Sequence, residues 1–361
     1  MSEAVVDHIV AVLPPLLQTL EAISFVARHL NPPDFGHVME VAGEPDAALR
    51  AVRPRLGEWP QEFAGVKRAL EASCDAALAG YQGLRAVQHG NGDIVGVFRA
   101  LRYAPRAQEA LFPLAAKLPP VSEFFIDPAL RGDAELLSRL AGPPHEDTGI
   151  FHDSNEPGSR GGFSLYVPEY YTPERAWPLV MALHGGNGNG RGFLWSWLRD
   201  ARSRGAILIA PTAVGNPSNK STWALMGEDV DAPNLMRILE LAQSRWNIDP
   251  ERMLLTGMSD GGTFCYVTGL ESASPFTHLA PVAATFHPLM AEMADAKRLR
   301  GLPLHIVHGR LDWMFPVQVA RQTQQALTAA GANVAYRELD DLSHCYPREM
   351  NVEMLAWMNG G

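Results

Sequence analysis

The stretch GMSDG at residues 257–261 places Ser259 between two glycines, directly after the apolar run 253–256 and before a helical pattern. This G-x-S-x-G pattern is typical of a sharp strand-to-helix turn that presents a serine hydroxyl above a sheet. The pattern alone is a weak signal, because glycine-rich turns between strands and helices are common. A serine is also a poor nucleophile unless a base accepts its proton. For Ser259 to act as a nucleophile, the chain must therefore supply a histidine and an acid.

Two later loops offer those groups. Asp312 follows the apolar run 304–308, and His344 follows the run 334–339. Loops at the carboxyl ends of parallel strands lie at the same edge of a sheet, so we expect both side chains near Ser259. The chain order Ser, Asp, His is one of the known orders of a serine-hydrolase triad. This combination is far more specific than the pentapeptide.

Two other carboxylates compete for the role of the acid. Asp340 and Asp341 lie only a few residues before His344. Loop carboxylates so close in sequence are usually solvated, so Asp312 is the preferred acid and the other two are alternatives.

A glycine-rich turn, LHGGNG at 183–188, ends an earlier apolar run. Such a turn can direct backbone N–H groups at a developing oxyanion. We expect the amides of Gly186 and of Asp260, the residue after the nucleophile, to be the two donors. Asn187 is a neighbour in the same turn and a candidate pocket residue. His184 is expected to orient the turn by hydrogen bonding and not to act as a base.

Other motifs have simpler interpretations. The run 186–192 alternates glycine with other residues but lacks the G-x-G-x-x-G register and a closing Lys-Ser/Thr, so phosphate binding is not expected. His305 and His308 are three apart in a predicted strand, point to opposite faces, and predict no metal site. Trp313 and Phe315 directly follow the proposed acid and are candidate lining residues of a substrate pocket.

The pattern from about residue 145 predicts an α/β fold with a doubly wound, mostly parallel sheet. Short apolar runs alternate there with helical patterns, as in sheets that are covered on both faces. The expected strands are 163–167, 178–183, 206–210, 253–256, 279–286, 304–308 and 334–339. The expected helices are 190–204, 231–246, 261–272, 316–330 and 347–358.

Residues 1–142 differ, being rich in Ala and Leu at helical spacing. They predict an all-helical domain in which proline pairs at 14–15, 32–33 and 119–120 separate the segments. A loop rich in Gly, Pro and polar residues, beginning at Pro143-Pro144, predicts a boundary before a catalytic domain at 143–361.

Composition limits the class of protein. Of 361 residues, 47% are hydrophobic and 19% charged, and the net charge is −10, which favours a globular fold and argues against nucleic acid as a partner. The three scattered cysteines predict no disulfide framework. No basic start precedes the first apolar stretch, which Asp7 and His8 interrupt, so we expect neither a signal peptide nor a membrane span and predict a cytoplasmic protein.

The residues above resemble the α/β-hydrolase superfamily, and in particular serine esterases of the phospholipase/carboxylesterase, polyhydroxybutyrate-depolymerase-like and feruloyl-esterase-like groups. The matching stretches are LHGG (183–186), IDPERMLLTGMSDGG (248–262), VHGRLDWMFP (307–316) and LSHCYP (342–347). The resemblance implies hydrolysis of a small-molecule ester through an acyl-serine, without a metal or other cofactor. It does not extend to the helical region.

Two alternatives remain at this stage. A peptidase or amidase could use the same triad, and a non-catalytic binding protein could retain the scaffold. The helical region is a candidate for an active-site cap, a surface for homo-oligomerisation, or a partner-binding element.

Overall fold

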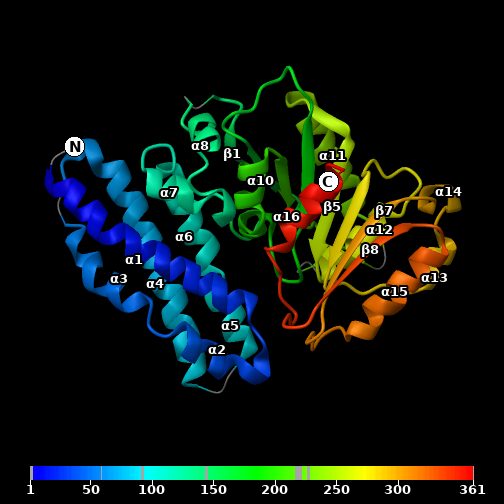
Figure 1. Cartoon of the computed structure of the whole chain (residues 1–361), viewed down its shortest axis with the longest axis horizontal. Helices are drawn as coiled ribbons and strands as arrows, with labels where there is room; N and C mark the ends of the chain where they lie inside the picture. The colour runs from blue at the N-terminus through cyan, green and yellow to red at the C-terminus, as the bar shows by residue number, and fades with distance from the viewer. Residues whose placement is uncertain are drawn as a thin grey trace. The chain divides into compact units, whose positions relative to one another are not determined.

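In the computed structural model, residues 3–57, 59–90, 93–142, 145–215, 222–225 and 228–360 are described. The chain forms two compact units, Met1–Asp133 and Ala134–Gly361. Figure 1 shows helices throughout the first unit and a sheet with helices in the second. This arrangement confirms the predicted fold class of a mostly parallel α/β sheet preceded by a helical region.

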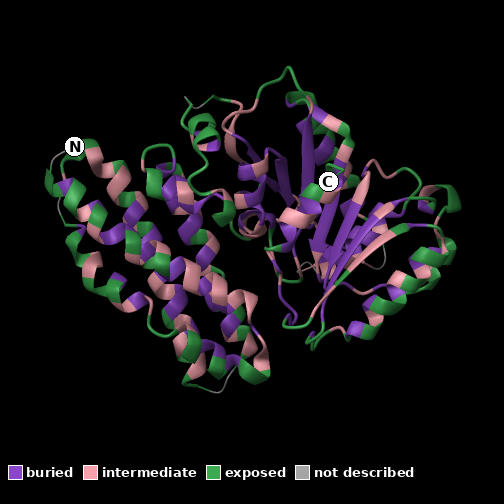
Figure 2. Ribbon diagram, in the orientation of Figure 1, coloured by how far each residue is buried: buried purple, intermediate pink, exposed green. Residues whose placement is uncertain are grey.

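The first unit is built from helices, joined by short 3-10 turns. Its α-helices are α1 (Glu3–Arg28), α2 (Phe35–Ala42), α3 (Asp46–Val52), α4 (Ala64–Gln88), α5 (Ile94–Leu101), α6 (Tyr103–Leu111) and α7 (Pro119–Phe124). The long helices α1 and α4 contact each other, and α4 also packs against α5 and α6. Figure 2 shows buried residues along the helices of this unit.

Helix α1 corrects one expectation. Pro14 and Pro15 lie inside the helix and do not end it, whereas the proline pairs at 32–33 and 119–120 do begin new helical turns. A proline in a helix interior costs about 3 kcal/mol, but the apolar stripe continues past the pair and is buried on both sides of it. The buried side chains are Val5, Ile9, Val12, Leu13, Leu16, Thr19, Leu20, Ile23 and Val26.

The length of α1 also corrects the expectation that no apolar stretch is long enough to span a bilayer. By length and composition alone, α1 could cross a membrane, and the core helix of a globular unit passes the same test. The buried stripe of α1 contacts α3 and α4.

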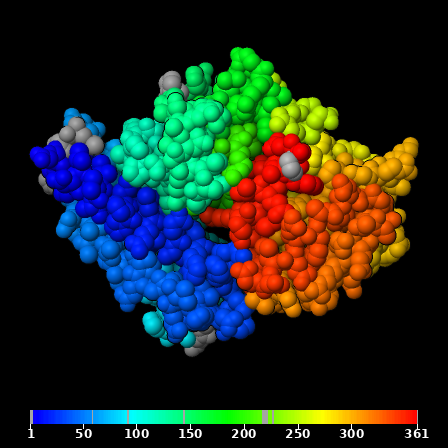
Figure 3. All heavy atoms as spheres, viewed as in Figure 1, coloured from blue at the N-terminus to red at the C-terminus, as the bar shows by residue number. Residues whose placement is uncertain are grey.

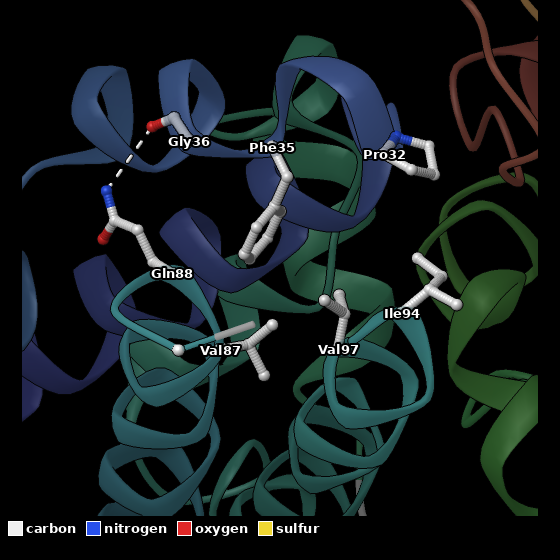
Figure 4. A pocket seen from close by; sticks show the side chains of 8 residues that line it. Pro32, Phe35, Gly36, Val87, Gln88, Ile94 and Val97 are labelled. Carbon is white, nitrogen blue, oxygen red and sulfur yellow. Dashed lines mark hydrogen bonds between the residues drawn. The ribbon is translucent and has the colours of Figure 1, made fainter. Parts of the chain in front are cut away.

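The helical unit contains a buried carboxylate with two arginine partners, and a pocket. Asp46, which is fully buried, accepts hydrogen bonds from Arg85 of α4 (2.6 Å) and Arg50 of its own helix (2.5 Å). A pocket of about 200 Å³ is lined by Pro32, Phe35, Gly36, Val87, Gln88, Gly90, Ile94 and Val97. Figure 4 shows how these residues lie around it. These lining residues include no titratable side chain, so the pocket offers no candidate chemistry.

The second unit is organised around an eight-stranded sheet with the order β1-β2-β4-β3-β5-β6-β7-β8. The pairs β1–β2 and β2–β4 are antiparallel and the remaining pairs are parallel. The strands are β1 (Gly149–Asp153), β2 (Phe163–Val167), β3 (Trp177–Leu183), β4 (Ile207–Pro211), β5 (Ile248–Met258), β6 (His278–Val282), β7 (Pro303–Gly309) and β8 (Asn333–Leu339).

Helices cover both faces of this sheet. Every residue of β3 and β4 is buried, and because successive side chains point to opposite faces, both faces must be covered. The helices are α8 (Ala134–Leu140), α9 (Gly190–Phe193), α10 (Leu198–Arg204), α11 (Asp231–Arg245), α12 (Asp260–Gly269), α13 (Leu289–Met293), α14 (Ala296–Leu299), α15 (Val317–Ala329) and α16 (Met350–Met358). Segments of α15 and α16 contribute to the visible surface of this unit in Figure 3.

The strands and helices differ from the sequence expectations in several places, among them β5, which begins at Ile248 and not at residue 253, and α13 and α14, which were not expected. Strand β1 was not expected. The predicted strand 279–286 ends at Val282, because Ala283 adopts a positive φ of 46° that extended backbone does not allow. The predicted helix 190–204 is divided into α9, a 3-10 turn and α10.

The boundary between the units also lies earlier than the expected 142/143 division. Helix α8 belongs to the second unit, where the Arg139 guanidinium lies 4.7 Å from the centre of the Tyr170 ring. Pro143 and Pro144 lie outside the described residues.

Candidate active site

Ser259 lies at the turn between β5 and α12. Its φ of 55° and ψ of −120° are sterically unfavourable for a residue with a side chain. The turn is held by hydrogen bonds from the Ser259 amide to the Val282 carbonyl (2.9 Å) and from the Thr263 amide to the Ser259 carbonyl (2.8 Å). Such a strained strand-to-helix turn is the geometry that the G-x-S-x-G pattern predicts.

The glycines around Ser259 are required by close backbone approach. A Cβ atom on Gly261 would lie 2.5 Å from the carbonyl oxygens of Leu183 and His184, and one on Gly257 would collide with the carbonyl of Gly261. These positions therefore tolerate only hydrogen, because real Cβ atoms do not approach backbone so closely. The same contacts bring the end of β3 against the start of α12.

The structure brings Ser259, His344 and Asp312 into one hydrogen-bonded line. His344 Nε2 lies 3.0 Å from Ser259 Oγ, and His344 Nδ1 lies 2.9 Å from Asp312 Oδ2. An ionised carboxylate only accepts hydrogen bonds, so Nδ1 donates to Asp312 and Nε2 is left to accept the serine proton. All three residues are at least nine-tenths buried.

The loop after β7 fixes the Asp312 carboxylate. Its Oδ1 accepts the backbone amides of Met314 (2.9 Å) and Phe315 (2.8 Å), which leaves Oδ2 for His344. His308 Nε2 donates to the Phe315 carbonyl (2.8 Å) and secures the same loop. Burial lowers the pKa of His308 and favours its neutral form, although the bond to the Phe315 carbonyl acts in the opposite direction.

The alternative acids lie in a different environment. The Asp340 side chain is 83% exposed and pairs with Arg310 at 3.1 Å, and Asp341 is also exposed. Asp312, whose side chain is fully buried, is thus the carboxylate beside His344.

The glycine-rich turn after β3 lies beside the serine. A Cβ on Gly185 would be 3.5 Å from Ser259 Cβ, and one on Gly186 would be 2.7 Å from Asp260 Oδ2. The Gly188 amide donates to the Gly185 carbonyl (3.0 Å), and Asn187 has a positive φ of 58°, which closes the turn tightly. Asp260 begins α12, so its amide is among those that have no partner within the helix.

His184 anchors this turn, as expected from the sequence. Its Nδ1 donates to the Gly185 carbonyl (2.7 Å) and its Nε2 accepts the Ala213 amide (3.1 Å), which requires the neutral ring. Complete burial lowers the pKa of His184 to about 4. Trp223 Nε1 donates to the His184 carbonyl (2.7 Å), and the Trp223 ring stacks on Phe264.

Several residues around the turn were missed from the sequence. Thr222 Oγ1 donates to the Asp260 carboxylate, which gives that acidic side chain a structural role. The fully buried Asp231 accepts three backbone amides from the loops that flank His184. A threonine and an aspartate in polar loops carry no distinguishing pattern, so spacing could not have identified them.

Two of the proposed pocket residues, Phe315 and Trp313, lie beside His344. The Phe315 ring lies edge-on to His344 at 5.2 Å between centroids, and Trp313 lies 6.4 Å away and is 45% exposed. Three other tryptophans of this unit, Trp195, Trp197 and Trp223, are core residues.

The histidines of β7 have separate partners. His305 Nε2 lies 3.3 Å from Glu353, whereas His308 bonds to Phe315. Among the described residues, no group of three or more His, Cys, Asp or Glu side chains could hold a metal ion. Gly190, in the run considered for phosphate, is a close-packing position where a Cβ would collide with the Ala210 carbonyl.

Comparison with known proteins gives the family context. Residues 224–358 match the profile of the Phospholipase/Carboxylesterase family, which confirms the resemblance seen in the sequence. The chain is 27% identical over 161 residues to a bifunctional acetylxylan esterase/xylanase, XynS20E, of Neocallimastix patriciarum, covering 44% of this chain and 22% of that protein. It is 31% identical over 136 residues to a poly(3-hydroxybutyrate) depolymerase of Ralstonia pickettii, covering 32% of this chain and 27% of that protein.

The matched segments thus span about a quarter of the length of those curated relatives. Among solved structures, esterase PE8 is 18% identical over 54% of this chain and 96% of its own, with a TM-score of 0.43. A ferulic acid esterase is 14% identical over 58% of this chain and 96% of its own, with a TM-score of 0.48.

Proposed function

We propose that this chain, whose residues 224–358 match the phospholipase/carboxylesterase family, is a serine carboxylesterase that acts through an acyl-serine intermediate. The observation that carries the proposal is the continuous hydrogen-bonded line Ser259–His344–Asp312 at 3.0 and 2.9 Å, ending on a serine in a strained turn. The family match supports hydrolysis of small esters as the reaction class.

In the proposed mechanism, His344 Nε2 accepts the proton as Ser259 Oγ attacks the ester carbonyl. Asp312 keeps the proton of His344 on Nδ1 and stabilises the imidazolium that forms. The protonated His344 then donates to the departing alkoxide, and the acyl group remains on Ser259. Water attacks this acyl-serine with His344 again as base, which releases the acid and regenerates the enzyme.

The amides of Gly186 and Asp260 are proposed to bind the oxyanion in both steps. The proposal is supported by the closeness of Gly186 to the Asp260 side chain and of Gly185 to Ser259. One such donor typically contributes a factor of about 10² to 10³ in kcat. Asn187, Trp313 and Phe315 are proposed to line the substrate pocket, with the two rings beside His344 forming an apolar wall.

Labelling with a fluorophosphonate tests this proposal directly. The reagent should modify one residue, and peptide mapping should locate it at Ser259, together with loss of p-nitrophenyl ester hydrolysis. Intact protein that neither labels nor hydrolyses esters would contradict the proposal and favour a non-catalytic binding protein.

The choice of substrate distinguishes the proposed esterase from the amidase alternative. Aminoacyl p-nitroanilides should be hydrolysed far more slowly than acyl p-nitrophenyl esters of similar size. A preference for the amides would replace the esterase assignment with that of a peptidase. The cytoplasmic location and the role of the helical unit as a cap, oligomer interface or partner site stay predictions.

A further inference from the structure

Two loop segments, one after β4 and one before α11, hold the oxyanion turn from separate points. The Ala213 amide of the first segment donates to His184 Nε2 at 3.1 Å. The Trp223 indole of the second segment donates to the His184 carbonyl at 2.7 Å. His184 in turn donates to the Gly185 carbonyl at 2.7 Å. The conformation of the turn therefore depends on where both segments lie.

A single buried carboxylate joins those segments. Asp231, the first residue of α11, is fully buried and accepts the amides of Val214 (2.6 Å) and Gly215 (3.3 Å) from the first segment. It also accepts the amide of Ala224 (2.8 Å) from the second. Burying a carboxylate costs free energy unless it is well hydrogen-bonded, and three amide donors provide that compensation.

Asp231 is not needed to cap its own helix. The amides of Asp231 and Ala232 at the start of α11 donate to the Asp229 carboxylate at 3.2 and 2.9 Å. The Asp229 carboxylate thus caps the helix, and the Asp231 carboxylate bonds to the two loop segments.

The second segment also contacts the other side of the oxyanion site. Thr222 donates to the carboxylate of Asp260, whose amide is one of the proposed oxyanion donors. The same carboxylate lies against Gly186, the other proposed donor, where a Cβ would be 2.7 Å away. Displacing this segment would therefore disturb both donors.

We propose that Asp231 is a positioning residue for the oxyanion site, which holds the two segments together and through them fixes His184 and the turn at Gly185-Gly186. This inference rests on the proposed esterase function. It predicts that Asp231 acts on transition-state stabilisation without touching the substrate.

Steady-state kinetics of the full-length chain test the proposal, with active sites counted by fluorophosphonate titration. Asp231→Asn replaces one acceptor oxygen with an N–H₂ group, so either the Val214 amide or the amides of Gly215 and Ala224 lose their acceptor. Trp223→Phe removes the N–H donor to His184 and keeps an aromatic ring, although a smaller one, at this buried position. Both should lower kcat on a p-nitrophenyl ester by about tenfold or more with little change in KM. Both should weaken binding of a trifluoromethyl ketone, which mimics the tetrahedral intermediate, by a similar factor.

Asp229→Asn is the matched control, because it removes the same charge nearby but keeps an acceptor oxygen for both helix amides. Its kcat per titrated site should match the wild type. If Asp231→Asn and Trp223→Phe lower the melting temperature while kcat per titrated site stays at the wild-type value, the proposal is overturned. If Asp231→Asn does not fold, Trp223→Phe decides by the same criterion. A wild-type protein with no ester turnover overturns the proposed function itself, and that result is obtained before any variant is compared.

Discussion

At the scale of residues, the candidate site depends on which atom of each side chain carries a proton. Asp312 fixes the tautomer of His344 through Oδ2, while its Oδ1 is occupied by the amides of Met314 and Phe315. His184 is held neutral by one donated and one accepted hydrogen bond. The two histidines therefore have different tasks: His344 bonds to Ser259, whereas His184 anchors the glycine-rich turn.

Replacing Asp312 should show whether this residue, and not Asp340 or Asp341, is the acid of the triad. Asp312→Asn preserves the side-chain shape but offers His344 an N–H₂ group or a neutral oxygen, so the productive tautomer is no longer enforced. We expect kcat to fall by about 10⁴, by analogy with the equivalent change in other triads. Asp340→Asn and Asp341→Asn serve as controls and should remain within about twofold of the wild type. If Asp312→Asn were harmless and Asp341→Asn inactive, the assignment of Asp312 as the acid would be wrong.

His184 should make the stability of the α/β unit depend on pH. Its pKa falls from 6.5 to about 4 on burial, so the unfolded chain binds a proton at pH values where the folded chain does not. The free energy of unfolding should therefore decrease as the pH falls below about 6.5 and level off below about 4. The full effect of this one group is about 3 kcal/mol.

Urea denaturation at pH 7, 5.5 and 4.5 would measure this dependence. Other buried histidines contribute to the same trend, so the informative quantity is the difference between the wild type and His184→Gln. The variant should be less stable at pH 7 and less sensitive to acid. An equal pH dependence in both proteins would show that His184 does not titrate as inferred.

At the scale of elements, the close packing of α12 against β3 and β5 fixes the turn that carries Ser259. Gly261→Ala would place a methyl group 2.5 Å from two backbone carbonyls of the β3 end. We expect a loss of several kcal/mol in the free energy of unfolding or no soluble protein, measured by urea denaturation. Gly65→Ala in α4 is the matched control, since its Cβ would meet nothing within 4 Å, and it should stabilise the chain by about 0.5–1 kcal/mol. Equal stability of the two variants would contradict the close-packing argument.

The elements that the sequence predicts best are those with an unambiguous apolar period. The continuous runs that became β3, β4 and β7 were located to within a few residues, because strands buried on both faces must be apolar throughout. Strand β1 pairs antiparallel at the sheet edge and is only partly buried, so its composition resembles a loop. The premature end of β6 depends on the positive φ of Ala283, for which alanine gives no signal.

The site was predictable to a similar degree. Ser259, Asp312 and His344 each follow a strongly patterned strand, so the topology alone brings them to one edge of the sheet. Asp231 and Thr222 act through backbone amides and a single hydroxyl bond, which depend on loop conformation and not on periodicity. The proline pair in α1 was misread because tertiary burial of an apolar stripe outweighs the local cost of proline.

At the scale of the whole molecule, every residue of the proposed mechanism belongs to the second unit, which has its own core. A chain of residues 134–361 should therefore fold and hydrolyse p-nitrophenyl acetate at a rate within about threefold of the full chain, because no proposed catalytic group is removed. Circular dichroism and the same assay check this outcome.

A second measurement on the full chain and the truncated chain tests whether the helical unit is a cap. Removal of residues 1–133 should then change the relative rates for short and long acyl esters. An identical acyl-chain profile in a folded, active truncated protein would count against the cap and leave oligomerisation or partner binding.

The hydrolysis rate of Ser259→Ala tests the central claim most directly. The variant loses only the Oγ atom, so its melting temperature should stay close to that of the wild type, while p-nitrophenyl ester turnover should fall by about 10⁴-fold or more. A folded Ser259→Ala protein that hydrolyses the ester at the wild-type rate would contradict the assignment of Ser259 as the nucleophile and, with it, the proposed mechanism.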